Sequence, residues 1–259
     1  MEVHHHSIPD KAGEKKKFKE YLLEFIMIFL AVTMGFFAET IREKFTEHRR
    51  AKEFAESMLQ DLREDTAQLR SYREYFNFAA STTDTLQQLL MKAEPANIPS
   101  GKLYWYGLFG GAHAYFVPND QTFQQMKSSG SLRYFNKHIA SAVGKYDRLC
   151  RIILTNQLAD GNIYAEVRKL RAQLFDFKYN DIANTIYQTN KKRFDYTRVD
   201  SFTRSNPPLL SNNKTLFNEY LELVRSRFLS RMVTNADSTL NQAKALIRDL
   251  RKEYHLKDD

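Results

Sequence analysis

The apolar residues between positions 21 and 38 form one hydrophobic stretch near the start of the chain. It reads YLLEFIMIFLAVTMGFFA and holds a single charge, Glu24, close to its beginning. As a helix it spans ~27 Å at ~1.5 Å per residue, close to the ~30 Å hydrocarbon core of a bilayer. The pattern predicts a transmembrane helix over residues 21–38, preceded by a basic polar head of residues 1–20.

A cleaved signal peptide and a buried helix of a soluble core are the two alternative interpretations of this stretch. A signal peptide needs a small-residue cleavage site, whereas Phe36 to Ile41 runs into a helical pattern without a turn residue. A core helix is rarely apolar around its whole circumference, yet no charge occurs from Phe25 to Ala38. We therefore expect a retained single-pass anchor.

Three further stripes of apolar residues at helical spacing follow the anchor. The first is continuous with it and runs to about Lys92, where the turn-forming sequence EPANIPSG begins two residues later. The second extends from about Asn136 to Phe177, with an interruption near residues 160–162. The third follows the prolines at 207 and 208 and can be capped by Ser211 or Asn212.

This pattern predicts an all-α protein. The single N-terminal transmembrane helix continues into an elongated bundle of three long helices plus short helices, and residues 39–259 form a helical extramembrane domain. The polar residues 182–206 are expected to be a loop. Asn119 and Asp120 are expected to cap a short helix, Gln121–Ser129, that ends at a left-handed Gly130, and a following helix can start at Ser131.

The segment from Tyr104 to Arg133 is the least regular part of the pattern and the candidate partner surface. Helix connections usually need 2 to 8 residues, whereas more than forty lie between Lys92 and Asn136. Aromatic residues and glycines cluster around the only tryptophan, and a KSSGS turn follows. The candidate contacts for a partner or an anion are Trp105, Lys127, Ser128, Ser129 and Arg133.

Each part of this segment also has a purely architectural interpretation. The aromatic residues can plug one end of the bundle, with Trp105 buried for stability. The KSSGS turn can be a helix C-cap, a turn and an N-cap in succession, with Arg133 bonded to backbone carbonyls. A P-loop is excluded, because the first glycine, the Gly-Lys-Ser/Thr order and a preceding strand are missing.

The composition argues against disulfides and catalysis. The single cysteine, Cys150, excludes a disulfide within the chain and any zinc site of two thiolates, and its place on an apolar stripe predicts a buried, inert thiol. No Gly-x-Ser-x-Gly motif occurs, and His113 and His138 stand near no catalytic signature. Glu64 and Asp65 are interpreted as helix surface. We therefore expect no enzyme, no cofactor and no resident metal.

The three consecutive histidines at the N-terminus are the one exception to be kept open. His4, His5 and His6 offer imidazole ligands for zinc, copper or nickel. No carboxylate or cysteine cluster stands near enough in sequence to complete a site, so a solvated tail is the alternative.

The net charge of +8 is concentrated in residues 137–204, which carry +6. Such a region could meet nucleic acid, anionic lipid headgroups or an acidic protein. Because acidic residues are interleaved with the basic ones, an ordinary solvated helix face is the favoured interpretation, and we do not expect nucleic-acid binding.

Membrane orientation rests on weak signals, since five basic residues precede the span and five follow it closely. The compact lysine cluster before the span resembles an uncleaved signal anchor, and long following domains translocate largely regardless of charge. We expect a cytoplasmic N-terminus and an extracytoplasmic C-terminal domain.

Three segments carry a resemblance to a known family: the MEVHHH head, the anchor with its flanks at residues 20–39, and QMKSSGSLR at residues 125–133. Together they resemble an uncharacterised family of single-pass bacterial membrane proteins, known only as a domain of unknown function. The resemblance supports the anchor and the helical exterior domain and brings no activity with it. We expect a single-pass protein of the cell (inner) membrane, with its C-terminal domain periplasmic or extracytoplasmic.

The sequence thus predicts a membrane-anchored helical interaction or sensory module without catalytic activity. Its expected partners are the lipid bilayer and either another envelope protein or a second copy of the chain. An accessory subunit of a transport or secretion complex is the alternative, and membrane-tethered nucleic-acid binding is a third that requires the opposite orientation.

Overall fold

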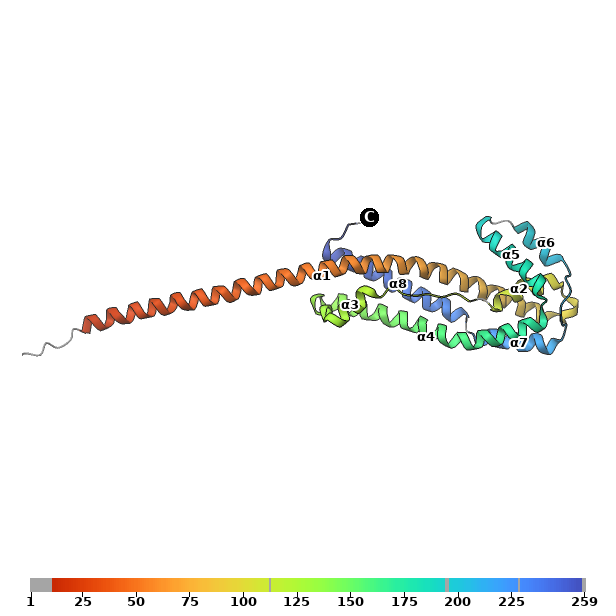
Figure 1. The fold of residues 1–259 in the computed structure, drawn as a ribbon, viewed down its shortest axis with the longest axis horizontal. Coiled ribbons are helices and arrows are strands. Elements are labelled where there is room, and N and C mark those ends of the chain that lie inside the picture. Colours follow the sequence, from red (N-terminus) through yellow and green to blue (C-terminus); the bar gives the residue numbers. More distant parts are fainter. Residues whose placement is uncertain (1–10, 112, 194–195, 228, 258–259) are drawn as a thin grey trace, which may run out of the picture. The chain divides into compact units, whose positions relative to one another are not determined.

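The computed structural model describes residues 11–111, 113–193, 196–227 and 229–257 (Figure 1). These residues form helices and no β-strand, which confirms the all-α prediction. The α-helices are α1 (Lys11–Lys92), α2 (Ser100–Leu108), α3 (Gln121–Ser129), α4 (Lys137–Leu174), α5 (Phe177–Arg193), α6 (Tyr196–Arg204), α7 (Lys214–Ser226) and α8 (Leu229–Tyr254). The short 3-10 turns are η1 (Pro95–Asn97), η2 (Phe109–Gly111) and η3 (Ser131–Tyr134).

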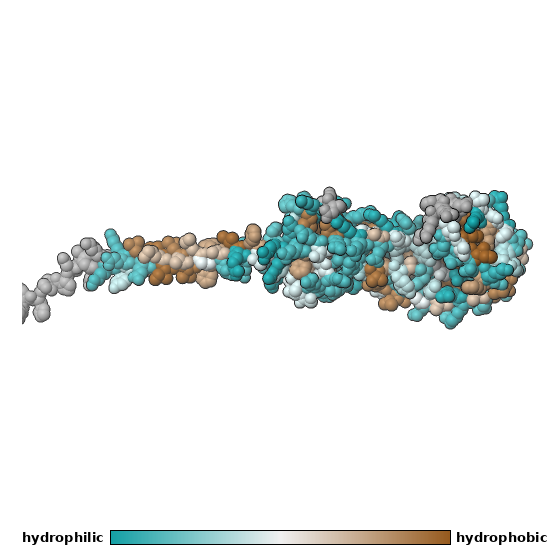
Figure 2. All heavy atoms as spheres, turned by 45° about the horizontal axis from the view of Figure 1, so that its top comes forward, coloured by the Kyte–Doolittle hydropathy of each residue, from teal (hydrophilic) through white to brown (hydrophobic). Residues whose placement is uncertain are grey.

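The contacts divide the chain into two units, residues 1–53 and residues 54–259. In the first unit, α1 contains the one helical segment of the described residues that is long and apolar enough to cross a membrane. None of that apolar window is buried, and side chains such as Phe25 and Phe36 are 65% and 73% exposed. Figure 2 shows this stretch as a brown band flanked by hydrophilic residues. This apolar stretch of α1 is therefore exposed in the single chain, whereas the later part of the same helix carries fully buried side chains.

The second unit, called the helical unit below, has a continuous apolar interior. Helix α4 packs along both α7 and α8, and α2 packs against α5 and α6. The largest fully buried side chains come from several helices, including Phe76 of α1, Tyr104 of α2 and Tyr220 of α7. The apolar stripes identified in the sequence therefore face a shared core.

Several element boundaries agree with the prediction. Helix α1 ends at Lys92, and the extended Glu94 precedes the 3-10 turn η1, which begins at Pro95. Helix α3 has the predicted bounds, and Gly130 follows it with φ of 70°. That left-handed conformation favours glycine because the residue has no Cβ.

Two predictions for α4 to α6 were wrong. Helix α4 runs without interruption through Asp160, Gly161 and Asn162, because Asp160 is buried and ion-paired inside the unit. Residues 182–206 are not a loop but mostly helix, in α5 and α6. These polar helices are held by α2: the Gly101 N–H donates to the Ser205 carbonyl over 3.0 Å. An added Cβ at Gly101 would lie 2.8 Å from the same oxygen.

The third long helix of the prediction is instead two helices, α7 and α8. The cap of α7 is Asn213 and not Ser211 or Asn212. The Asn213 side chain accepts hydrogen bonds from the backbone N–H groups of Thr215, at 2.8 Å, and Leu216, at 3.3 Å. Helix α2 was not predicted at all.

Candidate ligand-binding site

A cavity of about 340 Å³ lies in the helical unit between α1, α3 and α4. Its size falls at the lower end of the range that small-molecule sites occupy. Much of its wall is apolar, from Met58, Leu62, Pro118, Phe123, Val143 and Leu154. The polar groups that line it are Asp61, Asp65, Asn119, Asp120, Gln124, Lys127, Tyr146, Asp147, Cys150 and Arg151.

Two carboxylates of α1 line this cavity on the same helix face. Asp61 and Asp65 are four residues apart, so their side chains lie one turn above the other, and they are 9% and 0% exposed. The prediction that Asp65 lies on the surface was wrong, whereas Glu64 is indeed exposed. Asp65 continues the buried stripe of Leu62 and Leu69, and the three- and four-residue spacing turns it inward.

The hydrogen-bond partners of these two carboxylates among the described residues are neutral donors. Asp65 accepts hydrogen bonds from the Tyr146 hydroxyl at 2.6 Å and from the Asn119 backbone N–H at 2.7 Å. Asp61 accepts from the Thr122 backbone N–H at 3.2 Å. Within the described part of the chain, no Lys, Arg or His nitrogen forms an ion pair with either carboxylate.

These contacts also explain how α3 is capped. The Asp120 side chain does not cap the helix, because it accepts instead from the Gln124 amide at 2.9 Å. The carboxylate of Asp61 on α1 satisfies a first-turn N–H of α3 in its place. Asp120 therefore occupies the predicted N-cap position, but the side chain that bonds to the first turn belongs to Asp61, about sixty residues earlier.

Burial dominates the electrostatics of the cavity. It raises the pKa of the Asp65 carboxyl above its ordinary value, although the Tyr146 and Asn119 hydrogen bonds act in the opposite direction. Burial also raises the pKa of the Cys150 thiol to about 12, and the residue is 4% exposed. The thiol is thus buried, as the sequence predicted, and protonated at neutral pH.

Two basic residues also line this cavity, and neither forms an ion pair with Asp61 or Asp65. Arg151 forms an ion pair with Asp147 one helical turn away. Lys127 lines the cavity from the last turn of α3 and is exposed. Of the predicted contact residues, Lys127 is the one that reaches this cavity.

The other residues of the KSSGS turn bond within their own segment. The hydroxyls of Ser128 and Ser129 donate to the Gln125 carbonyl at 3.1 and 2.7 Å. The exposed Arg133 donates to the Tyr134 hydroxyl at 3.4 Å and not to the carbonyls that were expected. The turn therefore has the geometry of a helix end followed by a 3-10 turn.

The structure does not bring Trp105 together with Lys127. Trp105 lies on α2, and Figure 1 shows α2 and α3 at opposite ends of the helical unit. Its side chain is 6% exposed and meets the Phe109 ring edge-to-face, with 6.2 Å between centroids. This placement matches the architectural interpretation, in which Trp105 is part of the core. The neighbouring glycines do admit aromatic rings, since a Cβ at Gly107 would lie 2.7 Å from Phe175 Cζ.

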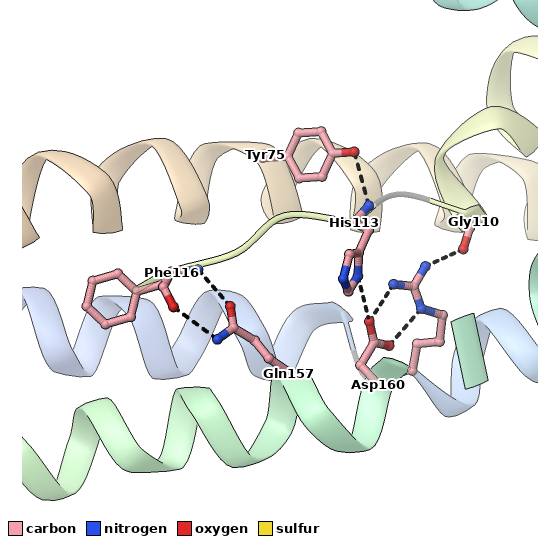
Figure 3. Close-up of polar contacts among 7 residues, drawn as sticks. Tyr75, Gly110, His113, Phe116, Gln157 and Asp160 are labelled. Carbon is pink, nitrogen blue, oxygen red and sulfur yellow. Dashed lines mark hydrogen bonds and ion pairs between the residues drawn. The ribbon is translucent and has the colours of Figure 1, made fainter. Parts of the chain in front are cut away.

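A second polar cluster was missed by the sequence analysis and is drawn in Figure 3. Arg227 and Asp160 have side chains only 0% and 2% exposed. They form a bidentate pair, with Nε to Oδ1 at 2.7 Å and Nη2 to Oδ2 at 2.6 Å. Arg227 also donates to the Gly110 carbonyl. The charges therefore compensate each other inside the core.

This cluster helps hold the strap, residues 113–120, which is not helical. His113 Nδ1 lies 3.5 Å from Asp160 Oδ2, and the His113 backbone N–H donates to the Tyr75 hydroxyl of α1 at 3.2 Å. Gln157 of α4 exchanges two hydrogen bonds with the backbone of Phe116, at 2.7 and 3.1 Å (Figure 3). The strap is thus bonded to both α1 and α4, and its last residues line the cavity.

Burial lowers the pKa of His113, and the neighbouring Asp160 carboxylate opposes that shift in part. A sequence signal for this cluster exists. Asp160 stands seven residues from both Ile153 and Val167, which are buried members of the same stripe. A charged residue in an apolar stripe predicts a buried ion pair or a site, and Asp65 gives the same signal on α1.

Comparison of the chain with protein families, curated proteins and solved structures finds no match. Among the described residues, no group of three or more His, Cys, Asp or Glu side chains is placed to hold a metal ion. The possible metal ligands His4, His5 and His6 lie outside the described residues.

Proposed function

We propose that this protein is a single-pass membrane module that binds a small molecule in the cavity between α1, α3 and α4. In this proposal it has no catalytic activity and reports the occupancy of the cavity to a partner in the same envelope. The observation that carries the proposal is the composition of α1. The same helix, Lys11–Lys92, contains both the apolar stretch at 21–38 and the cavity carboxylates Asp61 and Asp65.

The exposed apolar stretch supports the membrane part of the proposal. Leaving one large apolar side chain in water costs about 1.5–3 kcal/mol. More than ten such side chains between Tyr21 and Phe37 are at least 40% exposed, so water is a poor solvent for this segment. The hydrocarbon core of a bilayer solvates these apolar side chains without a protein partner. The resemblance to single-pass bacterial membrane proteins points in the same direction, with the N-terminus cytoplasmic and the helical unit outside.

The cavity supports the sensory part. Ligand binding that favours one arrangement of α1 relative to α3 and α4 biases any motion of α1 along or about its axis. In this proposal the signal passes to a second protein or to a second copy of the chain. An accessory subunit of a transport complex would use the same anchor without needing an occupied cavity.

Alkaline carbonate extraction of membranes from cells that express the full chain tests the anchor. The chain should stay in the pellet, because its apolar stretch is embedded in lipid. The double variant Ile28→Lys/Leu30→Lys should be released, whereas Leu158→Lys, a change at a 79% exposed position of α4, should stay in the pellet. Release of the unaltered chain would contradict anchoring.

Cys150 provides a native reporter for the cavity, since it is the only thiol and lines the wall. Methyl methanethiosulfonate modifies it through the thiolate, at a rate measured by mass spectrometry of the full chain in lipid nanodiscs at pH 9. The neutral probe 3-phenylpropan-1-ol should slow this reaction in a saturable way, while the rate with free glutathione stays unchanged. An unaltered rate with this alcohol and with its ammonium and carboxylate analogues, at every soluble concentration, would overturn ligand binding in the cavity.

A further inference from the structure

We propose that the ligand of the cavity is an organic cation, a small amine with an apolar body whose ammonium group binds Asp61 and Asp65. This inference rests on the proposed function and adds the chemical class of the ligand. Two carboxylates that are 9% and 0% exposed lie one helical turn apart, and no described cation pairs with them.

A second buried carboxylate in this protein, Asp160, provides a comparison, because its role is structural. Asp160 is 2% exposed at its side chain and is paired in a bidentate manner with Arg227. Asp65 is buried as deeply, but its partners are a hydroxyl and a backbone N–H. Burying an ionised carboxylate without a counterion is expensive. The missing counterion and the cavity occur at the same place, so a cation that enters the cavity supplies the compensation.

The walls favour an organic cation over a metal ion. Calcium takes six to eight oxygen ligands, and magnesium keeps most of its water. This cavity instead has the apolar side chains of Met58, Leu62, Val143 and Leu154 in the same lining as its carboxylates. Phe123 and Tyr146 add aromatic surface, which attracts ammonium groups. A ligand with an apolar body and one positive charge therefore matches both parts of the wall.

The overall charge of the lining agrees with a cationic ligand. Asp61, Asp65, Asp120 and Asp147 stand against Lys127 and Arg151, and Arg151 is already paired with Asp147. Lys127 is the basic residue at the cavity that should repel a cation. Its removal should therefore strengthen cation binding, whereas an anionic ligand would be weakened by the same change.

The test compares three probes that share one phenyl group and a three-carbon chain: 3-phenylpropylammonium, 3-phenylpropan-1-ol and 3-phenylpropanoate. Protection of Cys150 from methyl methanethiosulfonate is measured for the full chain in nanodiscs of zwitterionic lipid. The amine should protect at a concentration about tenfold lower than the alcohol, which corresponds to about 1.4 kcal/mol. The acid should protect least of the three.

Matched variants assign this preference to the buried pair. In Asp65→Asn and Asp61→Asn the amine and the alcohol should protect at concentrations within about twofold, while the exposed control Glu56→Gln keeps the tenfold gap. Each variant is compared with itself in the presence and absence of probe, because a change at Asp65 also alters Cys150. Lys127→Ala should widen the gap between amine and acid.

The outcomes separate the two proposals. Equal protection by amine and alcohol in the unaltered chain overturns the organic-cation ligand and leaves the ligand cavity in place. Protection by none of the three overturns both. If the amine still protects at a tenfold lower concentration than the alcohol in both Asp→Asn variants, the preference for the amine does not come from these carboxylates. That result also overturns this inference. The unaltered chain decides the first two outcomes, so a variant that fails to fold does not block the test.

Discussion

Removing one partner of the buried Asp160–Arg227 pair should destabilise the helical unit far more than removing an exposed pair on the same helix. The change Asp160→Asn keeps the size of the side chain and deletes its charge. It takes the carboxylate away from the Arg227 guanidinium, whose side chain is 0% exposed and which also donates to the Gly110 carbonyl. An uncompensated charge is then buried in the core.

The magnitude follows from two charge-assisted hydrogen bonds, at 2.7 and 2.6 Å. Hydrogen bonds to charged groups contribute about 1.5–3 kcal/mol each, and breaking a buried pair typically costs about 3–5 kcal/mol. We therefore expect Asp160→Asn to lower the free energy of unfolding by about 3–5 kcal/mol. The double variant Asp160→Asn/Arg227→Met should recover a large part of that loss, because it also removes the buried guanidinium charge.

The assay is guanidinium-induced unfolding of the full chain in nanodiscs, followed by circular dichroism. The matched control is Glu166→Gln, which breaks the α4 pair of Lys169 and Glu166, with side chains 69% and 55% exposed. Exposed pairs contribute about 0–1 kcal/mol, so this control should change stability little. The reasoning is refuted if Asp160→Asn costs no more than the control, or if the double variant is no more stable than the single one.

Three further predictions concern the strap and the two helices next to it. Because burial lowers the pKa of His113 below its ordinary 6.5, the unfolded chain binds a proton there that the folded chain does not. Stability should therefore fall as the pH drops below about 6.5, and His113→Gln should flatten this slope in pH-dependent melting curves; an unchanged slope would contradict it. Trp105→Ala should lower the free energy of unfolding by about 3–5 kcal/mol in chemical unfolding, since the side chain is 6% exposed. A loss below about 1 kcal/mol would contradict a core role for Trp105. Gly110→Ala should destabilise by about 1–3 kcal/mol, because the added Cβ would lie 2.6 Å from Val224 Cγ2. Gly144→Ala meets nothing within 4 Å and should stabilise α4 by about 0.5–1 kcal/mol; equal melting temperatures for the two glycine variants would refute the packing argument.

Local signals determine how much of the fold the sequence predicts. The ends of α1 and α3 were predicted because Pro95 and Gly130 act on the backbone within one or two residues. Helices α5 and α6 were not, because their composition is polar and their support is tertiary. An example is the Gly101 N–H bonded to the Ser205 carbonyl, across a separation that no local pattern reveals.

The candidate site was the less predictable part, for a physical reason. Charge was interpreted as a sign of exposure, and this holds for Glu64 but fails for Asp65 and Asp160, which stand in register with apolar stripes. The register of those stripes was visible in the sequence. The group that lies against each carboxylate was not visible in the sequence, because it depends on which helices pack together. Asp160 pairs with Arg227 at the end of α7, whereas Asp65 lines a cavity.

A crystal structure of the full chain grown with 3-phenylpropylammonium tests the central claim most directly. We expect the ligand in the cavity between α1, α3 and α4, with its nitrogen about 3 Å from a carboxylate oxygen of Asp61 or Asp65 and its ring against Val143 and Leu154. A cavity that stays empty at saturating amine, or an amine bound elsewhere with both carboxylates unaltered, would contradict the account.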